Sequence, residues 1–353
     1  MGLSTWTARR AARSAHVLVV EVPGNWMTRV CTERAVRERG WHVALSPADA
    51  DLLVVCGTPG AQLAPFVDRV WEQMPGPRAR SEITDPLGVL PALTRAQDDL
   101  LDRDQQREDA RERATEPDLD HGEMDHGDMD MAPGGIALAE GGEDRDGLEM
   151  DVLHLPLGPI LAHWPAGLVL RCSLQGDVIV DAEARWVRGG VPGEDALGAA
   201  PGAAIRVDNV AALLTLAGWP DAAVRARRLR DDLLRAEDPH ELRAELGALH
   251  RRVARSRLLR WSLRRIRPIG AEELAERAWP HAWAGDVHDR LLTMLERAAA
   301  SLRAAPGDPD DAAGGDAAAA LPHLVSGLDL ATARLVVASL DLDPLGTAEV
   351  QRA

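Results

Sequence analysis

The first part of the chain alternates short apolar runs with amphipathic segments. Three runs rich in β-branched residues predict strands: 16–22 (HVLVVEV), 41–45 (WHVAL) and 51–56 (DLLVVC). Helices are predicted between them, one from Asn25 as its N-cap to about Arg39 and one over about 61–74. Strands that alternate with helices indicate a parallel sheet, whose ligands bind beyond the carboxyl ends of the strands. Here those ends are the loops 23–25 and 57–60.

The later part of the chain is predicted to combine a hairpin with helices. Residues 168–187 (LVLRCSLQGDVIVDAEARWV) form two strand-like runs around a Gln-Gly-Asp turn, which predicts a β-hairpin. Leu242, Leu246, Leu249 and Val253 recur at helical spacing and form one apolar face. A second such face runs over 287–302, and a last helix is expected over about 324–340.

Residues 96–150 differ from both flanks because they are mostly charged, with few apolar anchors. Such a composition buries too little apolar surface to offset chain entropy. The pattern therefore predicts three parts. They are an α/β domain with a parallel sheet over 1–95, an acidic disordered linker with a short helix near its start over 96–150, and an α+β domain of a β-hairpin plus helices over 151–353.

Composition narrows the class of protein. The chain has 353 residues, of which 46% are apolar, enough for two ordinary cores. Its net charge of −16 argues against general nucleic-acid binding. Its apolar runs are far short of the about 20 residues needed to cross a bilayer. We expect a cytoplasmic protein with no transmembrane segment.

Two stretches carry a family resemblance. Residues 48–78 contain a strand that ends in a Gly-Thr turn, and then a helix that ends in Trp71-Glu72-Gln73-Met74-Pro75-Gly76-Pro77. This resembles the cluster-bearing small core subunit of respiratory complex I and the related small subunits of NiFe hydrogenases. Residues 158–184 are similar to the hairpin that opens the large, quinone-site subunit, and 339–344 resemble its close through Ser339-Leu340-Asp341 and Asp343-Pro344. The chain thus resembles a fusion of the two subunit types.

The cysteines depart from that family. Only Cys31, Cys56 and Cys172 are present, without a CxxC pair, and three thiols are too few for a usual iron–sulfur cluster. Cys31 is expected inside a helix as a buried apolar residue. The family's near-vicinal cysteines after the first strand are replaced by residues 22–25 (VPGN), and its nickel-binding pair by 343–347 (DPLGT). We therefore expect neither an iron–sulfur cluster nor a hydrogenase-type nickel centre.

The resemblance implies a non-catalytic or degenerate subunit of a complex I-like (NADH:quinone oxidoreductase) or hydrogenase-like redox complex, with a structural or accessory role. Its partners would be the other subunits of that membrane-bound complex, and it would lie on the inner face of the cell membrane. Two alternatives stay open. One is an active quinone-linked oxidoreductase subunit, and the other is a protein that handles copper or nickel through its linker.

Histidine and methionine gather in the linker at 121–131 (HGEMDHGDMDM). Thioethers select Cu(I), whereas imidazole suits Cu(II), Zn or Ni. The other interpretation is a solvated acidic segment with incidental histidine and methionine and weak copper or nickel affinity. The candidate metal ligands are His121, Met124, His126, Met129 and Met131.

Two further features suggest binding surfaces. The family's paired histidines near the start of the large-subunit hairpin survive only as His163, which with Trp164 could line a residual quinone crevice; the alternative is a packing or hydrogen-bonded histidine. Nine arginines are interleaved with leucines and Trp261 over 243–267. They suit an anionic lipid surface or an acidic partner, which could be this chain's own linker, or else they form a solvated helix face.

Overall fold

The computed structural model describes residues 14–115, 140–143, 149–189, 202–235, 238–303 and 317–342. They belong to two compact units. The first comprises Met1–Gly141 with the short pieces Pro159–Ala162 and Val187–Asp195, and the second holds the rest of the chain.

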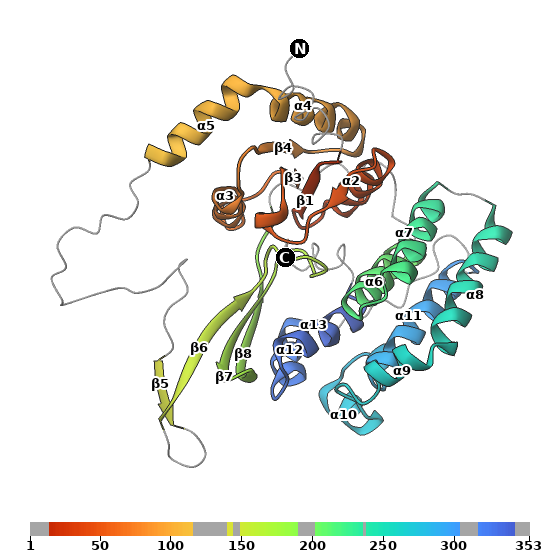
Figure 1. Ribbon diagram of the computed structural model, residues 1–353. Coiled ribbons are helices and arrows are strands. Elements are labelled where there is room, and N and C mark those ends of the chain that lie inside the picture. The colour runs from red at the N-terminus through yellow and green to blue at the C-terminus, as the bar shows by residue number, and fades with distance from the viewer. Residues whose placement is uncertain are drawn as a thin grey trace. The chain divides into compact units, whose positions relative to one another are not determined.

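The first unit is built on a parallel sheet with the strand order β2-β1-β3-β4, of which β1, β3 and β4 are labelled in Figure 1. This confirms the expected α/β class. In chain order its elements are β1 (His16–Glu21), α2 (Trp26–Glu38), β2 (His42–Val43), β3 (Leu52–Cys56), α3 (Ala64–Gln73), β4 (Ala79–Ile83), α4 (Val89–Leu101) and α5 (Arg103–Thr115).

Burial explains why β3 is an uninterrupted apolar run. All five of its residues are buried, as expected of a central parallel strand that is covered on both faces. On one face Leu52, Val54 and Cys56 pack with side chains from α2 and α4, among them Val36 and Leu93. The alternate residues of β3 face the opposite side of the sheet.

The first part of the predicted linker contains more helix than the short one expected near its start. Residues 96–115, assigned to the linker from their charge, are helical and complete α4 and α5. The strand β4 was not predicted, because its sequence ARSEI is half polar. It lies at the edge of the sheet, where such alternation is tolerated. The remainder of the predicted linker, apart from the strand residues 140–143 and 149–150, lies outside the described residues.

The second unit contains a sheet with the strand order β5-β6-β7-β8. The pairs β6–β7 and β7–β8 are antiparallel, and β7 and β8 form the predicted hairpin, with Gly176 at φ 61° in its turn. The strand β6, with Pro156 near its end, was not predicted. The strands are β5 (Glu140–Glu143), β6 (Glu149–Leu157), β7 (Leu168–Gln175) and β8 (Val178–Trp186).

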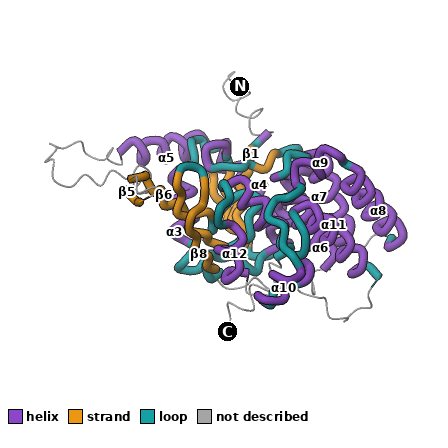
Figure 2. Tube along the Cα trace, turned by 90° about the horizontal axis from the view of Figure 1, so that it is seen from below, coloured by secondary structure: helices purple, strands orange, loops and turns teal. Residues whose placement is uncertain are grey.

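Eight helices complete the described part of this unit, and Figure 2 shows α6, α7, α8 and α11 alongside one another. None of the described helices is both long and apolar enough to cross a membrane. The helices are α6 (Gly202–Leu216), α7 (Pro220–Leu234), α8 (Pro239–Arg255), α9 (Arg257–Leu263), α10 (Ala271–Arg277), α11 (Val287–Ser301), α12 (Ala317–Val325) and α13 (Leu330–Ser339).

The last predicted helix is divided in two. Between α12 and α13 the chain turns at Gly327, whose φ is 81°. There the Gly327 N–H donates to the Ile179 carbonyl at 2.8 Å, and the Ile179 N–H donates to the Leu328 carbonyl at 2.9 Å. The turn therefore pairs with β8. The local sequence pattern favoured one continuous helix, but this long-range contact ends α12 before α13 begins.

Candidate functional site

The carboxyl edge of the parallel sheet is the expected ligand site of the first unit. Because β1 lies between β2 and β3, the strand order reverses between β1 and β3, and ligands of such sheets bind outside that point. Here the space over Gly57 is taken by the fully buried side chain of Asn25. A Cβ on Gly57 would lie 2.6 Å from Cγ of Asn25.

Asn25 holds this place through a contact that the sequence did not predict. Its Nδ2 donates to the Val22 carbonyl at 3.2 Å, and its side chain makes no capping hydrogen bond to α2, although it stands at the N-cap position. The expected side-chain cap was therefore wrong. The amide instead closes the loop that follows β1.

A second segment of the same unit covers this edge. Residues 187–189 belong to the first unit, and the Arg188 N–H donates to Oε1 of Gln62 at 3.0 Å. A Cβ on Gly189 would lie 2.7 Å from the Pro23 carbonyl oxygen, so the two backbones are in close approach. Both loops predicted to receive a ligand are thus packed against the protein's own chain.

The cysteine thiols of this unit belong to its core. Cys56 is fully buried at the end of β3, and burial raises the pKa of its thiol to about 12. Its Sγ donates to Oγ1 of Thr32 at 3.5 Å, which suits the protonated form. Cys31 lies in α2, as expected, but it is half-buried and not buried, and it packs against the same core.

Cys172 is isolated from those thiols in sequence and in fold. It is buried in β7 of the second unit, where burial raises the pKa of its thiol to about 11. Thiolates are the metal-binding and nucleophilic form of cysteine, so a raised pKa disfavours both roles. Cys56 and Cys172 are therefore buried core residues of their respective units.

The proposed quinone contacts lie just before β7. His163 and Trp164 are half-buried, and His163 has a left-handed backbone with φ 57°. Nε1 of Trp164 donates to the Leu168 carbonyl at 2.8 Å, and a Cβ on Gly158 would lie 2.7 Å from that nitrogen. The indole therefore serves to close the connection between β6 and β7. A quinone contact at His163 stays a prediction.

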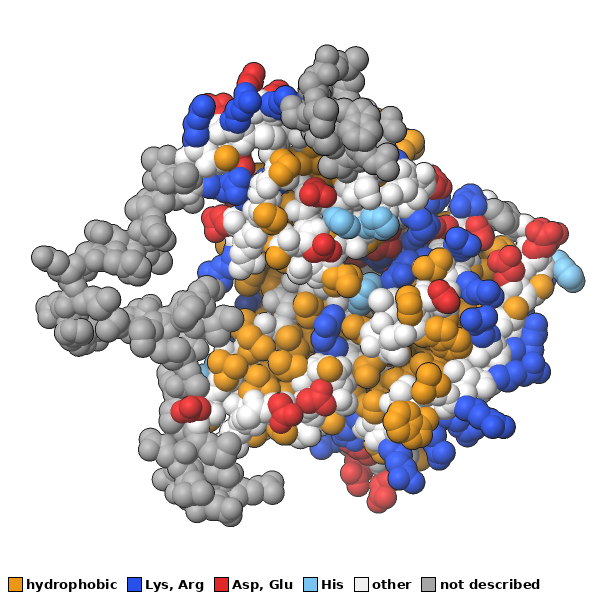
Figure 3. All heavy atoms as spheres, in the orientation of Figure 1, with side chains coloured by type: hydrophobic (Ala, Val, Ile, Leu, Met, Phe, Trp, Pro, Cys, Tyr) orange, Lys and Arg blue, Asp and Glu red, His pale blue; other side chains and the backbone are white. Residues whose placement is uncertain are grey.

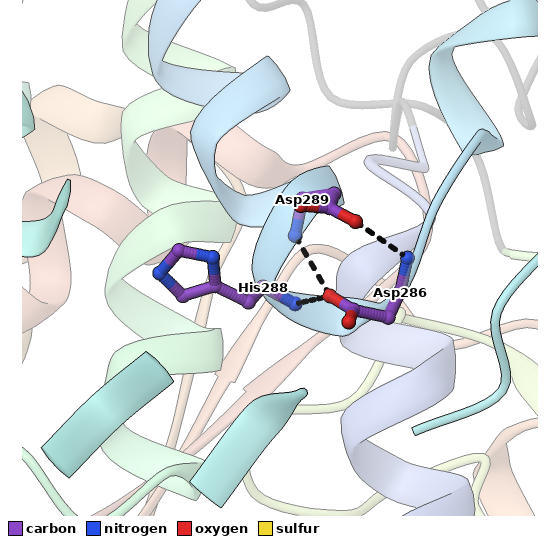
Figure 4. Close-up of side chains that lie close together, drawn as sticks. All are labelled: Asp286, His288 and Asp289. Carbon is purple, nitrogen blue, oxygen red and sulfur yellow. Dashed lines mark hydrogen bonds between the residues drawn. The ribbon is translucent and has the colours of Figure 1, made fainter. Parts of the chain in front are cut away.

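The candidate linker ligands His121, Met124, His126, Met129 and Met131 lie outside the described residues. Within the described part, Asp286, His288 and Asp289 place one possible ligand atom each within 4.8 Å of the others (Figure 4). Their carboxylates form the capping box of α11, however. Asp286 accepts from the backbone N–H groups of His288 and Asp289, and Asp289 accepts from that of Asp286. The group is a helix cap and carries no metal assignment.

The resemblance segment Ser339-Leu340-Asp341 is an anchor point of the helical part. Nε of the buried Arg290 donates to Oγ of Ser339 at 2.8 Å, and Nε1 of the buried Trp283 donates to the Leu340 carbonyl at 2.9 Å. Asp341, with φ 53°, receives hydrogen bonds from Arg297 at 2.7 Å and Asn209 at 3.0 Å. The family resemblance pointed to this segment, but no local sequence pattern indicates its partners Arg290, Trp283 and Arg297, which lie far from it along the chain. Asp343-Pro344 lies outside the described residues.

A polar pocket was also not predicted. It has a volume of about 200 Å³ at the start of β4. The Arg78 guanidinium stacks 4.1 Å from the centroid of the Trp71 ring and pairs with Asp109 at 2.9 Å. Trp71 comes from the Trp-Glu-Gln-Met-Pro motif, so part of that motif anchors α5. The pocket is lined by Trp71, Arg78, Ala79, Arg80, Asp99, Gln105, Gln106 and Asp109.

Comparison with known proteins does not place the chain in a family. No family model matches it, and no curated protein matches it either. The likeness to complex I and hydrogenase subunits therefore rests on the motifs given above and stays a prediction.

Proposed function

We propose that this protein is a non-catalytic, degenerate subunit of a complex I-like or hydrogenase-like membrane-associated redox complex, with a structural role. The observation that carries the proposal is the closed carboxyl edge of the parallel sheet. Asn25 is packed onto Gly57, and the Arg188 N–H is bonded to Gln62, where such sheets receive ligands. A unit that keeps the α/β fold while its own residues occupy the usual ligand-binding edge is suited to a structural role in a complex.

The chemistry of the thiols supports the same proposal. A cluster-bearing subunit needs several accessible thiolates close together. In this chain Cys56 is a buried, protonated core residue bonded to Thr32, and Cys172 lies in the other unit. Both thiols are buried in the cores of their units, which supports a packing role.

The Ser339-Leu340-Asp341 segment adds support from the second unit. In this chain its polar groups are satisfied by Arg290, Trp283 and Arg297. A buried network of this kind makes a rigid helical framework, which a subunit that holds others together requires.

The test is a cysteine-free chain in the native host. Deletion of the gene should lower membrane redox activity, and complementation with Cys31→Ser/Cys56→Ala/Cys172→Ala should restore it as well as the wild type does, because no thiol is a ligand. Anaerobically purified wild type should contain no stoichiometric iron, sulfide, nickel or flavin. Stoichiometric iron and sulfide, or failure of a variant with wild-type circular dichroism, would overturn the proposal.

A further inference from the structure

A cationic face with exposed apolar side chains lies on the second unit, at the end of α8 and along α9. We call it the arginine face, and Figure 3 shows arginine side chains with hydrophobic side chains between them in this region of the molecule. Leu258 is 75% exposed and Trp261 is 79% exposed, among the largest values for apolar side chains of the described residues. The exposed arginines of the face are Arg251, Arg255, Arg257, Arg260, Arg264 and Arg265.

Helix geometry places the two apolar side chains outward. In α9 the buried residues are Leu259 and Leu263, which are one turn apart and dock the helix on the unit. At about 100° per residue, Trp261 points directly away from that buried pair, and Leu258 lies one turn before it on the outer side. Arg257, Arg260 and Arg264 lie on one side of this outward line, and Leu258 lies on the other. Their exposure therefore follows from how α9 is docked and not from fraying.

The arginines of this face lack the partners that other arginines of the chain have. Arg29, Arg78, Arg80 and Arg297 each contact a carboxylate. Within the described ranges, none of the six arginines of the face makes an ion pair, and the indole N–H of Trp261 has no acceptor. Over 243–267 the sequence has nine arginines and a single acidic residue, Glu245.

This local charge opposes that of the whole chain, which carries −16. Charges more than about 8 Å apart are largely screened at physiological ionic strength, so an approaching surface responds to the nearest patch. An anionic surface is thus repelled by most of the protein and attracted by the arginine face. The arginine face therefore determines how the protein is oriented on an anionic surface as well as how tightly it binds there.

We propose that the arginine face binds the surface of an anionic lipid bilayer, with Trp261 and Leu258 inserted at the headgroup level. Tryptophan favours the membrane–water interface because its ring is apolar and its N–H is polar. Arginines beside it bind lipid phosphates, and each contributes about 1 kcal/mol near an anionic leaflet. An acidic peptide would satisfy the arginines but would leave a protruding Leu-Trp pair in water. This inference does not depend on the redox-complex proposal.

Co-sedimentation of the full-length chain with vesicles tests the proposal. Vesicles of phosphatidylcholine with about 30 mol% phosphatidylserine should bind the protein, and pure phosphatidylcholine vesicles should not. Binding should weaken at least about tenfold when salt is raised from about 0.1 M to about 0.5 M. Trp261 fluorescence cannot be isolated among ten tryptophans, so the difference spectrum between wild type and Trp261→Phe is used to detect insertion.

Variants separate the two contributions. Leu258→Ser/Trp261→Ser and Arg260→Gln/Arg264→Gln should each weaken binding about tenfold or more, since each removes apolar insertion or two phosphate contacts. The matched controls lie on the first unit: Leu87→Ser, which alters a leucine that is 88% exposed, and Arg95→Gln/Arg107→Gln. The controls should bind as the wild type does.

Three results would overturn the proposal. Wild type that does not bind anionic vesicles at low salt, or face variants that bind as tightly as the controls, would do so directly. Binding that appears only when Asp125, Asp128 and Asp130 are changed to asparagine would assign the face to the chain's own acidic segment. Concentration-dependent self-association that Leu258→Ser/Trp261→Ser abolishes, without vesicle binding, would assign it to a second copy.

Discussion

Asn25 and Gly57 lie against each other at the carboxyl edge of the parallel sheet, where the buried amide of Asn25 occupies the space that a side chain at position 57 would need. Gly57 has φ 104°, a conformation that L side chains rarely adopt. Both the backbone and the neighbour therefore require glycine. The contact joins the loop after β1 to the loop after β3 at the carboxyl edge of the sheet.

Gly57→Ala should destabilise the first unit by about 2–4 kcal/mol, because the strained backbone and the clash with Asn25 act together. Gly40→Ala is the matched control, since Gly40 has φ 73° and no atom within 4 Å of a Cβ at that position. Its cost should stay near about 1 kcal/mol. Urea denaturation followed by circular dichroism measures both. Equal losses for the two variants would show that the Asn25 contact adds nothing.

The elements that could be predicted from the sequence are those whose buried residues form a local pattern, either a continuous apolar run or an apolar face at helical spacing. The run over Leu52–Cys56 is apolar because both faces of β3 are covered, and Leu242, Leu246 and Leu249 are buried on the predicted face of α8. The linker predicted from residue 96 onward was expected to hold only a short helix near its start, whereas residues 96–115 complete α4 and form α5. The physical reason is that α5 has few apolar residues and is anchored by polar contacts, such as that of Asp109 with Arg78. A prediction of disorder from high charge and low apolar content takes no account of such contacts.

The candidate site was predicted less well because its contacts are long-range. The loops 23–25 and 57–60 follow from strand order alone, but that Asn25 would fill the space over Gly57 depends on how the two loops pack. The resemblance pointed to Asp341, which follows α13, whereas its partner Arg297 lies 44 residues earlier in α11. Only the fold brings these side chains together.

Gln106→Ala should release α5 from β4. The Gln106 side chain accepts from the Arg78 N–H at 2.9 Å and donates to the Arg78 carbonyl at 2.8 Å, so it pairs with the backbone just before this edge strand as a neighbouring strand would. Its loss should lower the local free energy of opening by about 1–3 kcal/mol. Hydrogen exchange at 103–113 measures this change. Gln105→Ala, at an exposed position, should leave exchange unaltered; if both variants accelerate it equally, helix propensity and not the Gln106 contacts is responsible.

Cys56 should resist alkylation in the native protein. With its thiol pKa raised to about 12 by burial, the thiolate fraction at pH 8 is only about one in ten thousand. Raising the pH should increase its reactivity, whereas the half-buried Cys31 should be labelled first at pH 8. Iodoacetamide labelling and peptide mass spectrometry with and without urea measure the order. Rapid native labelling of Cys56 would contradict its placement in the core.

His288 should make the second unit less stable in acid. Its pKa is lowered chiefly by burial, with opposing effects from Asp286 and Asp289 and a further lowering by Arg260 and Arg264. Below its ordinary pKa of 6.5 the unfolded chain therefore binds more protons than the folded one. The free energy of unfolding should fall as pH drops from about 7 to about 5.

Replacing His288 isolates that effect. His288→Leu should flatten the fall in stability over this pH range, because the variant has no proton to bind at that position. His240→Gln, which alters an exposed histidine of α8, should keep the wild-type pH dependence. Urea denaturation at several pH values provides the comparison. An unchanged slope in His288→Leu would place the titrating group elsewhere.

Arg290 tests whether a buried charge in α11 is a net stabiliser. It is fully buried, and burial lowers the pKa of its guanidinium to about 10. Its Nη1 nevertheless donates to the carbonyls of Arg267, Trp283 and Gly285. Removing the charge relieves desolvation, but it leaves buried acceptors without a donor at about 1–3 kcal/mol each. Because several acceptors lose their donor at once, Arg290→Met should destabilise the unit by about 3 kcal/mol or more in urea denaturation, whereas Arg260→Met at an exposed position should change stability by less than about 0.5 kcal/mol. A Met variant as stable as the wild type would mean that the cost of burying the charge outweighs its hydrogen bonds.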